Sequence, residues 1–191
     1  MGKMHQEGVT LIELMVTLSV IAIIVAVGVP AMRDFFLTNQ MSAAANDIVS
    51  SLHFARSEAV KRGTTTRLCP STDWATRNPT CNAAASLADG WIIIDTSAAG
   101  IILQRHEPLS DRIRLKDDID GWIDFSPSGE PDNPNAEGEF NLLLCDDREN
   151  RDMGRGLAAG RWINVRGPGR PRVYDRKTDV QNTLGGCNNS S

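Results

Sequence analysis

An apolar run near the start of the sequence limits what this chain can fold into. From Val9 to Val29 there are 21 residues, and Glu13 is the only charged residue among them. A helix of about 20 apolar residues is long enough to cross the hydrocarbon core of a bilayer. A carboxylate inside such a segment is costly and marks a functional position. We therefore predict a membrane-spanning or filament-core helix over 9–29, with Glu13 as its functional residue.

The eight residues before this run are polar and end in Gly8 at the apolar edge. An ordinary secretory signal places its small residues after the apolar core, not before it. Gly8, Val9 and the stretch Thr-Leu-Ile-Glu-Leu at 10–14 resemble the class III signal of type IV pilins and pseudopilins. The resemblance implies that a prepilin peptidase cuts between Gly8 and Val9 on the cytoplasmic side, and that the new amine is methylated. Residues 1–8 would then be a leader peptide.

The same resemblance assigns roles to two helix residues. Glu13 becomes the fifth residue of the mature chain, and Pro30 corresponds to the proline usual in this family. An ionised carboxylate in lipid requires an opposite charge, and the resemblance supplies one in the Val9 amine of a neighbouring subunit. Such a pair would set the axial register of a filament. The alternative is a carboxylate near the membrane interface that is protonated or reached by headgroup water.

Past Pro30, apolar residues recur at steps of three and four. This spacing predicts an amphipathic continuation of the helix over 30–62, with Gly63 as its C-cap. Pro30 removes a backbone donor and is expected to kink the helix or to loosen it locally. The apolar stripe consists of Leu37, Met41, Ala44, Ile48, Leu52, Ala55 and Ala59.

Residues 63–191 contain short strand-like runs between turns, which predict a β-rich head with a basic C-terminal segment. Strands that follow one long helix indicate an α+β fold with antiparallel sheets. The stretch Ser126–Gly138 holds three prolines and is predicted to be a surface loop. The predicted strands are Thr64–Cys69, Trp91–Asp95, Ile101–Arg105, Arg112–Lys116, Trp122–Phe125, Phe140–Cys145, Arg161–Val165 and Arg172–Tyr174.

The head is similar to minor pseudopilins of the GspH/FimT type. This resemblance implies a long helix packed on two antiparallel sheets. It also implies an inner-membrane protein with a periplasmic head that later enters the tip of a pilus or pseudopilus. The implied partners are other pilins, the prepilin peptidase and the inner-membrane assembly platform. The stretches that carry the resemblance are Ala55–Val60, Cys69–Ser71 with a second cysteine after it, Asp89–Ile93, Phe125–Gly129 and the Gly-Arg-x-Arg stretch Gly169–Arg172.

The chain has four cysteines and no Cys-x-x-Cys pair, so zinc and thioredoxin-type sites have little support. An even number behind a membrane anchor is typical of an oxidising compartment and of two disulfides. Four cysteines allow three pairings. We favour Cys69–Cys81, which closes a short loop, and Cys145–Cys187, which fixes the C-terminal tail.

Charge is segregated along the chain. Residues 81–147 carry 14 acidic and 4 basic side chains, whereas residues 148–177 carry 9 basic and 3 acidic ones. A basic segment on an acidic protein favours an anionic partner, although it could equally match the acidic half internally or on a neighbouring pilin. Glycines and prolines between the arginines favour an exposed loop. The basic residues in question are Arg161, Arg166, Arg170, Arg172, Arg176 and Lys177.

In some members of the resembled family, the Gly-Arg-x-Arg motif binds DNA during natural transformation. Gly169, Arg170 and Arg172 match the motif, and Pro171 occupies its variable position. Contacts to phosphate would make such binding weakly sequence-specific and steeply salt-dependent. Trp162 and Tyr174 could stack on bases, but aromatic residues at such positions more often fill a core.

Signals for an enzyme are weak. Neither a P-loop, nor a nucleophile elbow, nor a dinucleotide fingerprint occurs, and no two histidines have metal-ligand spacing. The acidic run 117–121 does not follow the EF-hand pattern and reads as a solvated turn. The sequence thus predicts a minor pilin or pseudopilin without cofactor or metal, which helps to initiate or cap a filament. A DNA receptor for uptake, contacting double-stranded DNA on the same scaffold, is the alternative.

Overall fold

The computed structural model describes residues 9–97, 100–132, 135 and 138–188 of the chain. The chain divides into two compact units, Met1–Thr38 and Asn39–Ser191. One helix, α1 (Leu11–Arg62), supplies the described secondary structure of the first unit and continues into the second. It contains Pro30 and continues as helix beyond it.

The described part of the first unit is a helix with an exposed, mostly apolar surface. Residues 9–33 are all exposed, and an 18-residue window of α1 has a mean hydropathy of 2.6. Among the described residues this is the one helix whose length and composition would allow it to cross a bilayer. An exposed surface of this kind is stable only in lipid or against other apolar helices.

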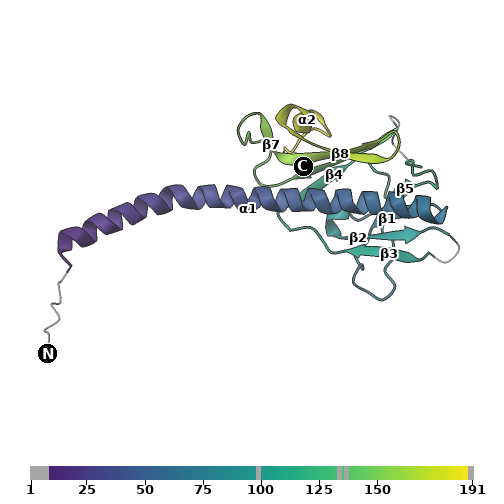
Figure 1. The fold of residues 1–191 in the computed structure, drawn as a ribbon, viewed down its shortest axis with the longest axis horizontal. Coiled ribbons are helices and arrows are strands. Elements are labelled where there is room, and N and C mark those ends of the chain that lie inside the picture. Colours follow the sequence, from purple (N-terminus) through teal and green to yellow (C-terminus); the bar gives the residue numbers. More distant parts are fainter. Residues whose placement is uncertain (1–8, 98–99, 133–134, 136–137, 189–191) are drawn as a thin grey trace. The chain divides into compact units, whose positions relative to one another are not determined.

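The second unit holds two four-stranded antiparallel sheets (Figure 1). The order is β3-β2-β1-β5 in the first sheet and β4-β6-β7-β8 in the second. The predicted α+β class with two antiparallel sheets is therefore confirmed. The strands are β1 (Thr66–Pro70), β2 (Trp91–Asp95), β3 (Ile102–His106), β4 (Arg114–Asp117), β5 (Ile123–Phe125), β6 (Glu139–Cys145), β7 (Leu157–Arg166) and β8 (Arg170–Arg176).

The main core lies between α1 and the two sheets. Met41, Ile48 and Leu52 on α1 are buried, as the spacing of the apolar stripe predicts. Alternate residues of the strands face the helix because side chains along a strand alternate between its two faces. α1 ends where Gly63 adopts a φ of +64° and donates its N–H to the Ala59 carbonyl. Core residues from the sheets include Leu68, Trp91, Ile93, Ile123, Phe125, Phe140, Leu142, Leu144, Ile163 and Val165.

A second, smaller core covers part of the opposite face of the β4–β8 sheet. There Val180 of the short helix α2 (Lys177–Asn182) packs with Leu143 and Ala158. The structure pairs Cys145 with Cys187 and Cys69 with Cys81, so the favoured disulfide pairing is confirmed. The first of these disulfides joins the C-terminal tail to β6.

Two features of the head differ from the sequence prediction. Strand β8 contains the predicted strand Arg172–Tyr174 but begins earlier, so Arg170 lies in a strand and not in the exposed loop expected between the arginines. A turn at Gly167–Gly169 joins β8 to β7. Pro171 is compatible with β8 because β8 is an edge strand, and proline within sheets is largely confined to edge strands. Neither α2 nor the 3-10 turn η1 (Leu87–Asp89) was predicted, because short helices carry little periodic signal.

Candidate functional site: the outer face of the β7–β8 hairpin

Three cross-strand pairs line one face of the β7–β8 hairpin. Arg166 lies opposite Arg170, and Asn164 lies opposite Arg172. The third pair, Trp162 and Tyr174, follows along the strands. Residues opposite one another in an antiparallel ladder share a face, and so do alternate residues of one strand. The alternation therefore places Arg170 and Arg172 on one face even though Pro171 separates them.

We call Arg166, Arg170 and Arg172 the arginine face. All three are exposed, and with Gly167 and Pro168 they line a hollow of about 340 Å³. The carboxylate of Glu139 approaches this face, with its Oε2 4.0 Å from Nη1 of Arg166. Like charges directly opposite one another in a sheet repel. The face therefore carries a net positive charge that an external anion would neutralise.

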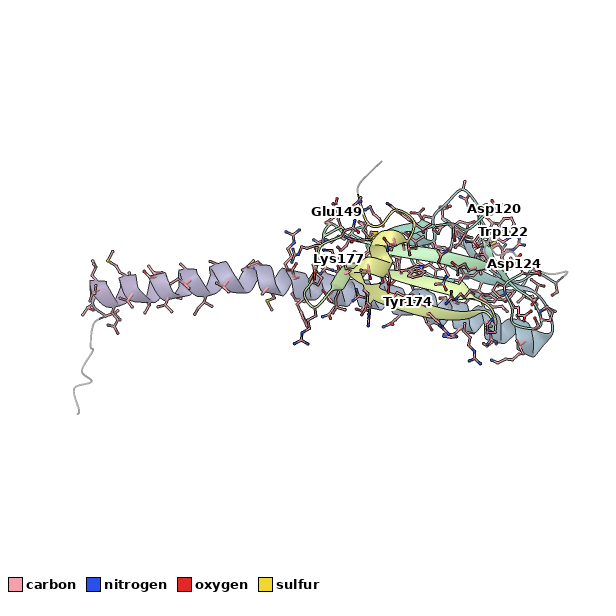
Figure 2. All side chains as sticks on the ribbon, turned by 90° about the horizontal axis from the view of Figure 1, so that it is seen from above. Asp120, Trp122, Asp124, Glu149, Tyr174 and Lys177 are labelled. Carbon is pink, nitrogen blue, oxygen red and sulfur yellow. A yellow bond between two sulfur atoms is a disulfide. The ribbon has the colours of Figure 1, made fainter. Side chains whose placement is uncertain are left out.

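The aromatic pair beside the arginine face is engaged within the protein. The rings of Trp162 and Tyr174 stack with centroids 4.4 Å apart and an interplanar angle of 24°. Nε1 of Trp162 donates to Oδ1 of Asn141 at 2.9 Å. Figure 2 labels Tyr174 on β8, next to α2. The arrangement matches the core-filling interpretation of these residues better than that of rings free to stack on bases.

Buried asparagine side chains lie beside the arginine face. Nδ2 of Asn164 donates to Oδ1 of Asn141 at 2.8 Å, and Nδ2 of Asn141 donates to Asp118 at 2.8 Å. Oδ1 of Asn164 is buried and has no hydrogen-bond partner among the described residues. Side-chain networks of this kind hold their members in fixed rotamers. These residues carried no recognisable motif, and only the fold brings them together.

Only some of the residues predicted to contact DNA lie together in the structure. The predicted set was Arg161, Arg166, Gly169, Arg170, Arg172 and Arg176. Arg161 is half-buried and donates to the carbonyls of Ala158 and Gly160. Its burial lowers the pKa of the guanidinium, while the nearby charge of Asp175 acts in the opposite direction. Arg176 lies at the far end of β8, opposite Leu157 and next to α2. The structure therefore separates Arg161 and Arg176 from Arg166, Arg170 and Arg172 along the hairpin, whereas Gly169 lies in the turn beside the arginine face.

Sequence reasoning also missed a role for Arg56. It lies on α1, and its Nε donates to the carbonyl of Pro168 in the β7–β8 turn at 2.9 Å. The only signal in the sequence was its place in the Ala55–Val60 stretch of the family resemblance.

The acidic run 117–121 has structural partners. Asp118 accepts the backbone N–H of Asn141 at 2.7 Å, and Asp117 accepts the N–H of Ile119. Just beyond the run, Asp124 receives two hydrogen bonds from Arg67, whose guanidinium lies 4.0 Å from the Trp122 ring centroid. Figure 2 labels Trp122 and Asp124 in this segment. Within the described residues, no three His, Cys, Asp or Glu side chains are grouped to hold a metal ion.

The predicted processing and assembly residues lie at the other end of the chain. Gly8 is outside the described residues. Val9 is exposed just before α1, and Glu13 is exposed in the first turn of that helix. The backbone N–H of Glu13 donates to Oγ1 of Thr10 at 3.3 Å, and the Leu14 N–H donates to the Thr10 carbonyl. Thr10 thus acts as the N-cap of α1.

Two family models match this chain. Residues 44–157 match the type II transport protein GspH, and residues 3–29 match the prokaryotic N-terminal methylation motif. The first match ends where β7 begins, so the arginine face lies beyond it. The second covers Val9, Glu13 and the apolar run.

Individual proteins give shorter or more distant matches. The fimbrial protein EcpC of Eikenella corrodens is 46% identical over 46 residues, which is 24% of this chain and 30% of that protein. The chain therefore matches less than a third of the length of that relative. The type IV minor pilin FimU of Pseudomonas aeruginosa superposes with a TM-score of 0.52 at 20% identity, over 71% of this chain and 89% of FimU. The minor pseudopilin EpsH of Vibrio cholerae gives a TM-score of 0.47 at 12% identity, over 71% of this chain and 97% of that structure.

Proposed function

This chain belongs to the GspH family of type II transport proteins, and from that premise we propose that it is a minor pilin or pseudopilin that helps to initiate or cap a filament. In this proposal residues 1–8 are a leader that prepilin peptidase removes after Gly8. The helix over 9–29 then anchors the protein in the inner membrane, with the continuation 30–62 and the head 63–191 in the periplasm. The assembly platform extracts the anchor into a type IV pilus or a type II secretion pseudopilus.

One observation carries this proposal: an exposed apolar helix with one carboxylate precedes a separately folded head. Residues 9–33 contribute nothing buried to the head, so this surface requires another apolar environment. When the subunit passes from the membrane into the filament, the apolar helices of neighbouring subunits replace the lipid, so the helix stays in an apolar environment. Glu13 would then be the residue that selects one register, since an unpaired charge there is expensive.

The test is to replace Glu13 by valine in cells that assemble the filament. We expect Glu13→Val to be trimmed after Gly8 and to remain in the membrane but to enter filaments poorly, because the charge pair with the neighbouring Val9 amine is lost. N-terminal sequencing and quantification in sheared filaments measure the two steps. Glu7→Val, which changes the same residue type within the leader, is the matched control for incorporation. Normal incorporation of the Glu13 variant would refute the docking role.

A second candidate function has its own supporting observation. The exposed arginine face, with its hollow and its weak internal pairing, is suited to phosphate groups, and arginine binds phosphate oxygens in a bidentate manner. We infer that it contacts double-stranded DNA during uptake. Arg166, Arg170 and Arg172 would carry the binding, with Gly169 shaping the turn.

This second function is tested with the full-length chain in a neutral detergent and a mixed-sequence duplex. Replacing Arg170 and Arg172 together by glutamine should abolish the gel shift, and the binding of the natural chain should weaken steeply with salt. Arg161→Gln with Arg176→Gln removes the same amount of charge at positions farther from the β7–β8 turn and should leave most of the shift. Equal losses in the two double variants would indicate a non-specific charge effect and reject the site.

A further inference from the structure

Three segments that are distant in the sequence meet behind the arginine face. Arg56 comes from α1, Gly129 from the turn after β5, and Pro168 from the turn between β7 and β8. They belong to, or directly adjoin, three of the stretches on which the family resemblance rests. Their meeting point joins the helix to both sheets.

The contact between them is a shared hydrogen bond. Nε of Arg56 lies 3.0 Å from the carbonyl oxygen of Gly129 and 2.9 Å from that of Pro168. A single N–H donated to two acceptors is a three-centre bond. Bonds from a charged donor are about twice as strong as bonds between neutral groups. The guanidinium therefore ties the β7–β8 turn to α1 and to the loop after β5.

The backbones at this point lie too close for any side chain larger than hydrogen. A Cβ on Gly169 would lie 2.3 Å from the Gly129 carbonyl oxygen and 3.2 Å from the ring of Phe125. Gly169 also has a φ of +73°, which L-residues rarely adopt. Gly167, in the same turn, has a φ of +58° but nothing within 4 Å of its Cβ position. The turn therefore approaches the loop after β5 closely at residue 169 and not at residue 167, so lack of space demands glycine only at position 169.

This tie bears directly on the arginine face. Arg166 and Arg170 flank the turn and are paired across the ladder, so their like charges push the end of the hairpin apart. A fixed turn keeps them at one separation despite that repulsion. Because the arginines are already held at a fixed spacing, less conformational entropy is lost when they bind a ligand with regularly placed charges.

We propose that Arg56 is a positioning residue that fixes the β7–β8 turn and thereby the spacing of the arginine face. The effect of Arg56 on DNA binding rests on the second function proposed above. The hydrogen bonds from Arg56 to Gly129 and Pro168 do not depend on that function. In this proposal Arg56 acts through the carbonyls of Gly129 and Pro168 and not by contacting a phosphate of the DNA.

The first experiment measures the tie without DNA. Hydrogen exchange of residues 166–172 is compared between the full-length natural chain and the variants Arg56→Met and Arg105→Met in a neutral detergent. Arg105 is the matched control because it also donates to two backbone carbonyls, of Thr76 and Arg77, at a distant point of the head. We expect exchange in 166–172 to become about tenfold faster in the Arg56 variant only, the effect of losing a charge-assisted bond on a local opening equilibrium. Equal exchange in both variants would overturn the proposal.

The second experiment adds double-stranded DNA, and its two glycine variants change no charge. Gly169→Ala introduces the clash with Gly129, whereas Gly167→Ala introduces only the strain of a positive φ. We expect Gly169→Ala to lower affinity about tenfold more than Gly167→Ala, and Arg56→Lys to bind better than Arg56→Met because it retains a donor. If Arg56→Met weakens binding while exchange of 166–172 stays unchanged, Arg56 is itself a phosphate ligand and the positioning role is wrong. If the natural chain fails to bind DNA, the second function is lost and the exchange experiment alone decides on the tie.

Discussion

Single polar residues inside the head hold its layers in place. Nε1 of Trp91 on β2 is buried and donates to Oγ of Ser51 on α1 at 3.0 Å. A buried N–H that loses its partner costs the desolvation of that group, about 1–3 kcal/mol. This pair therefore favours one angular placement of α1 over the sheet, a specificity that apolar contacts alone would not provide.

Ser51→Ala should lower the free energy of unfolding by about 1–3 kcal/mol, because it strands the indole N–H of Trp91. Denaturant unfolding of the full-length chain measures the loss. Ser57→Ala is the control, since its hydroxyl donates only to the Phe54 carbonyl one turn earlier in the same helix. A loss no larger than that of the control would show that water satisfies the indole.

Asp73 makes the loop inside the Cys69–Cys81 disulfide sensitive to acid. Its carboxylate accepts bonds from the Thr80 backbone N–H and from the Ser71 hydroxyl, and these lower its pKa below the usual 3.8. A carboxyl group with a lowered folded pKa stabilises the protein above its unfolded pKa, and this contribution disappears as the pH falls through the folded value.

We expect Asp73→Asn to be less stable than the natural chain at pH 7, because the amide accepts the same bonds more weakly. The difference should shrink as the pH falls below the ordinary aspartate value of about 3.8. Unfolding midpoints of both proteins at a series of pH values test this sign. A difference that grew on acidification would contradict the assigned cause.

At the scale of elements, α2 depends on a covalent tie. A helix of six residues has little stability of its own. Val180 provides its buried contact, and the Cys145–Cys187 disulfide closes the tail over the sheet. The sheet supplies the surface, and the disulfide keeps the tail on it.

Replacing Cys145 and Cys187 by alanine should destabilise the head more than replacing Cys69 and Cys81. The sequence separations are 42 and 12 residues, so the longer loop gains about 1 kcal/mol more from loop-closure entropy. Unfolding of the two double variants in denaturant measures the difference. Cleavage after Lys177 by trypsin should also appear first in the Cys145 and Cys187 variant. The reverse order of stabilities would mean that contacts within the shorter loop outweigh the entropic term.

At the scale of the whole molecule, the N-terminal and C-terminal parts of α1 have different surroundings. Residues 9–33 are exposed, whereas the stripe from Met41 to Ala59 forms the core of the head. Stability of the head and compatibility with lipid are therefore encoded in separate parts of one helix. Substitutions in one part should leave the function of the other intact.

Leu18→Ala and Leu52→Ala make the same change in these two parts. Leu18 is 58% exposed and Leu52 is 0% exposed, so only the second should destabilise the head, by about 2–5 kcal/mol. Thermal unfolding of both full-length variants in detergent, followed by near-ultraviolet circular dichroism, gives the comparison. Loss of head stability in the Leu18 variant would show that the units are coupled.

Much of this architecture could be predicted from local patterns in the sequence. Helix periodicity identified the buried stripe around Leu52, and alternation with turn residues located the strands to within a few residues. Loop length favoured the observed disulfide pairing. The glycines and prolines at 167–171 predicted a longer loop than the structure has, because the residues that favour loops also form tight hairpin turns and the strand already begins at Arg170.

The sequence by itself determined that this chain has an apolar helix with one carboxylate, a β-rich head and a basic end, since those properties depend on residue type and spacing. Only the tertiary structure decided which arginines form a surface. Strand pairing placed Arg166 opposite Arg170 and separated Arg161 from them, and Arg56 reached Pro168 across 112 residues. Such long-range pairs are set by how the sheets and the helix pack together, and no local pattern encodes them.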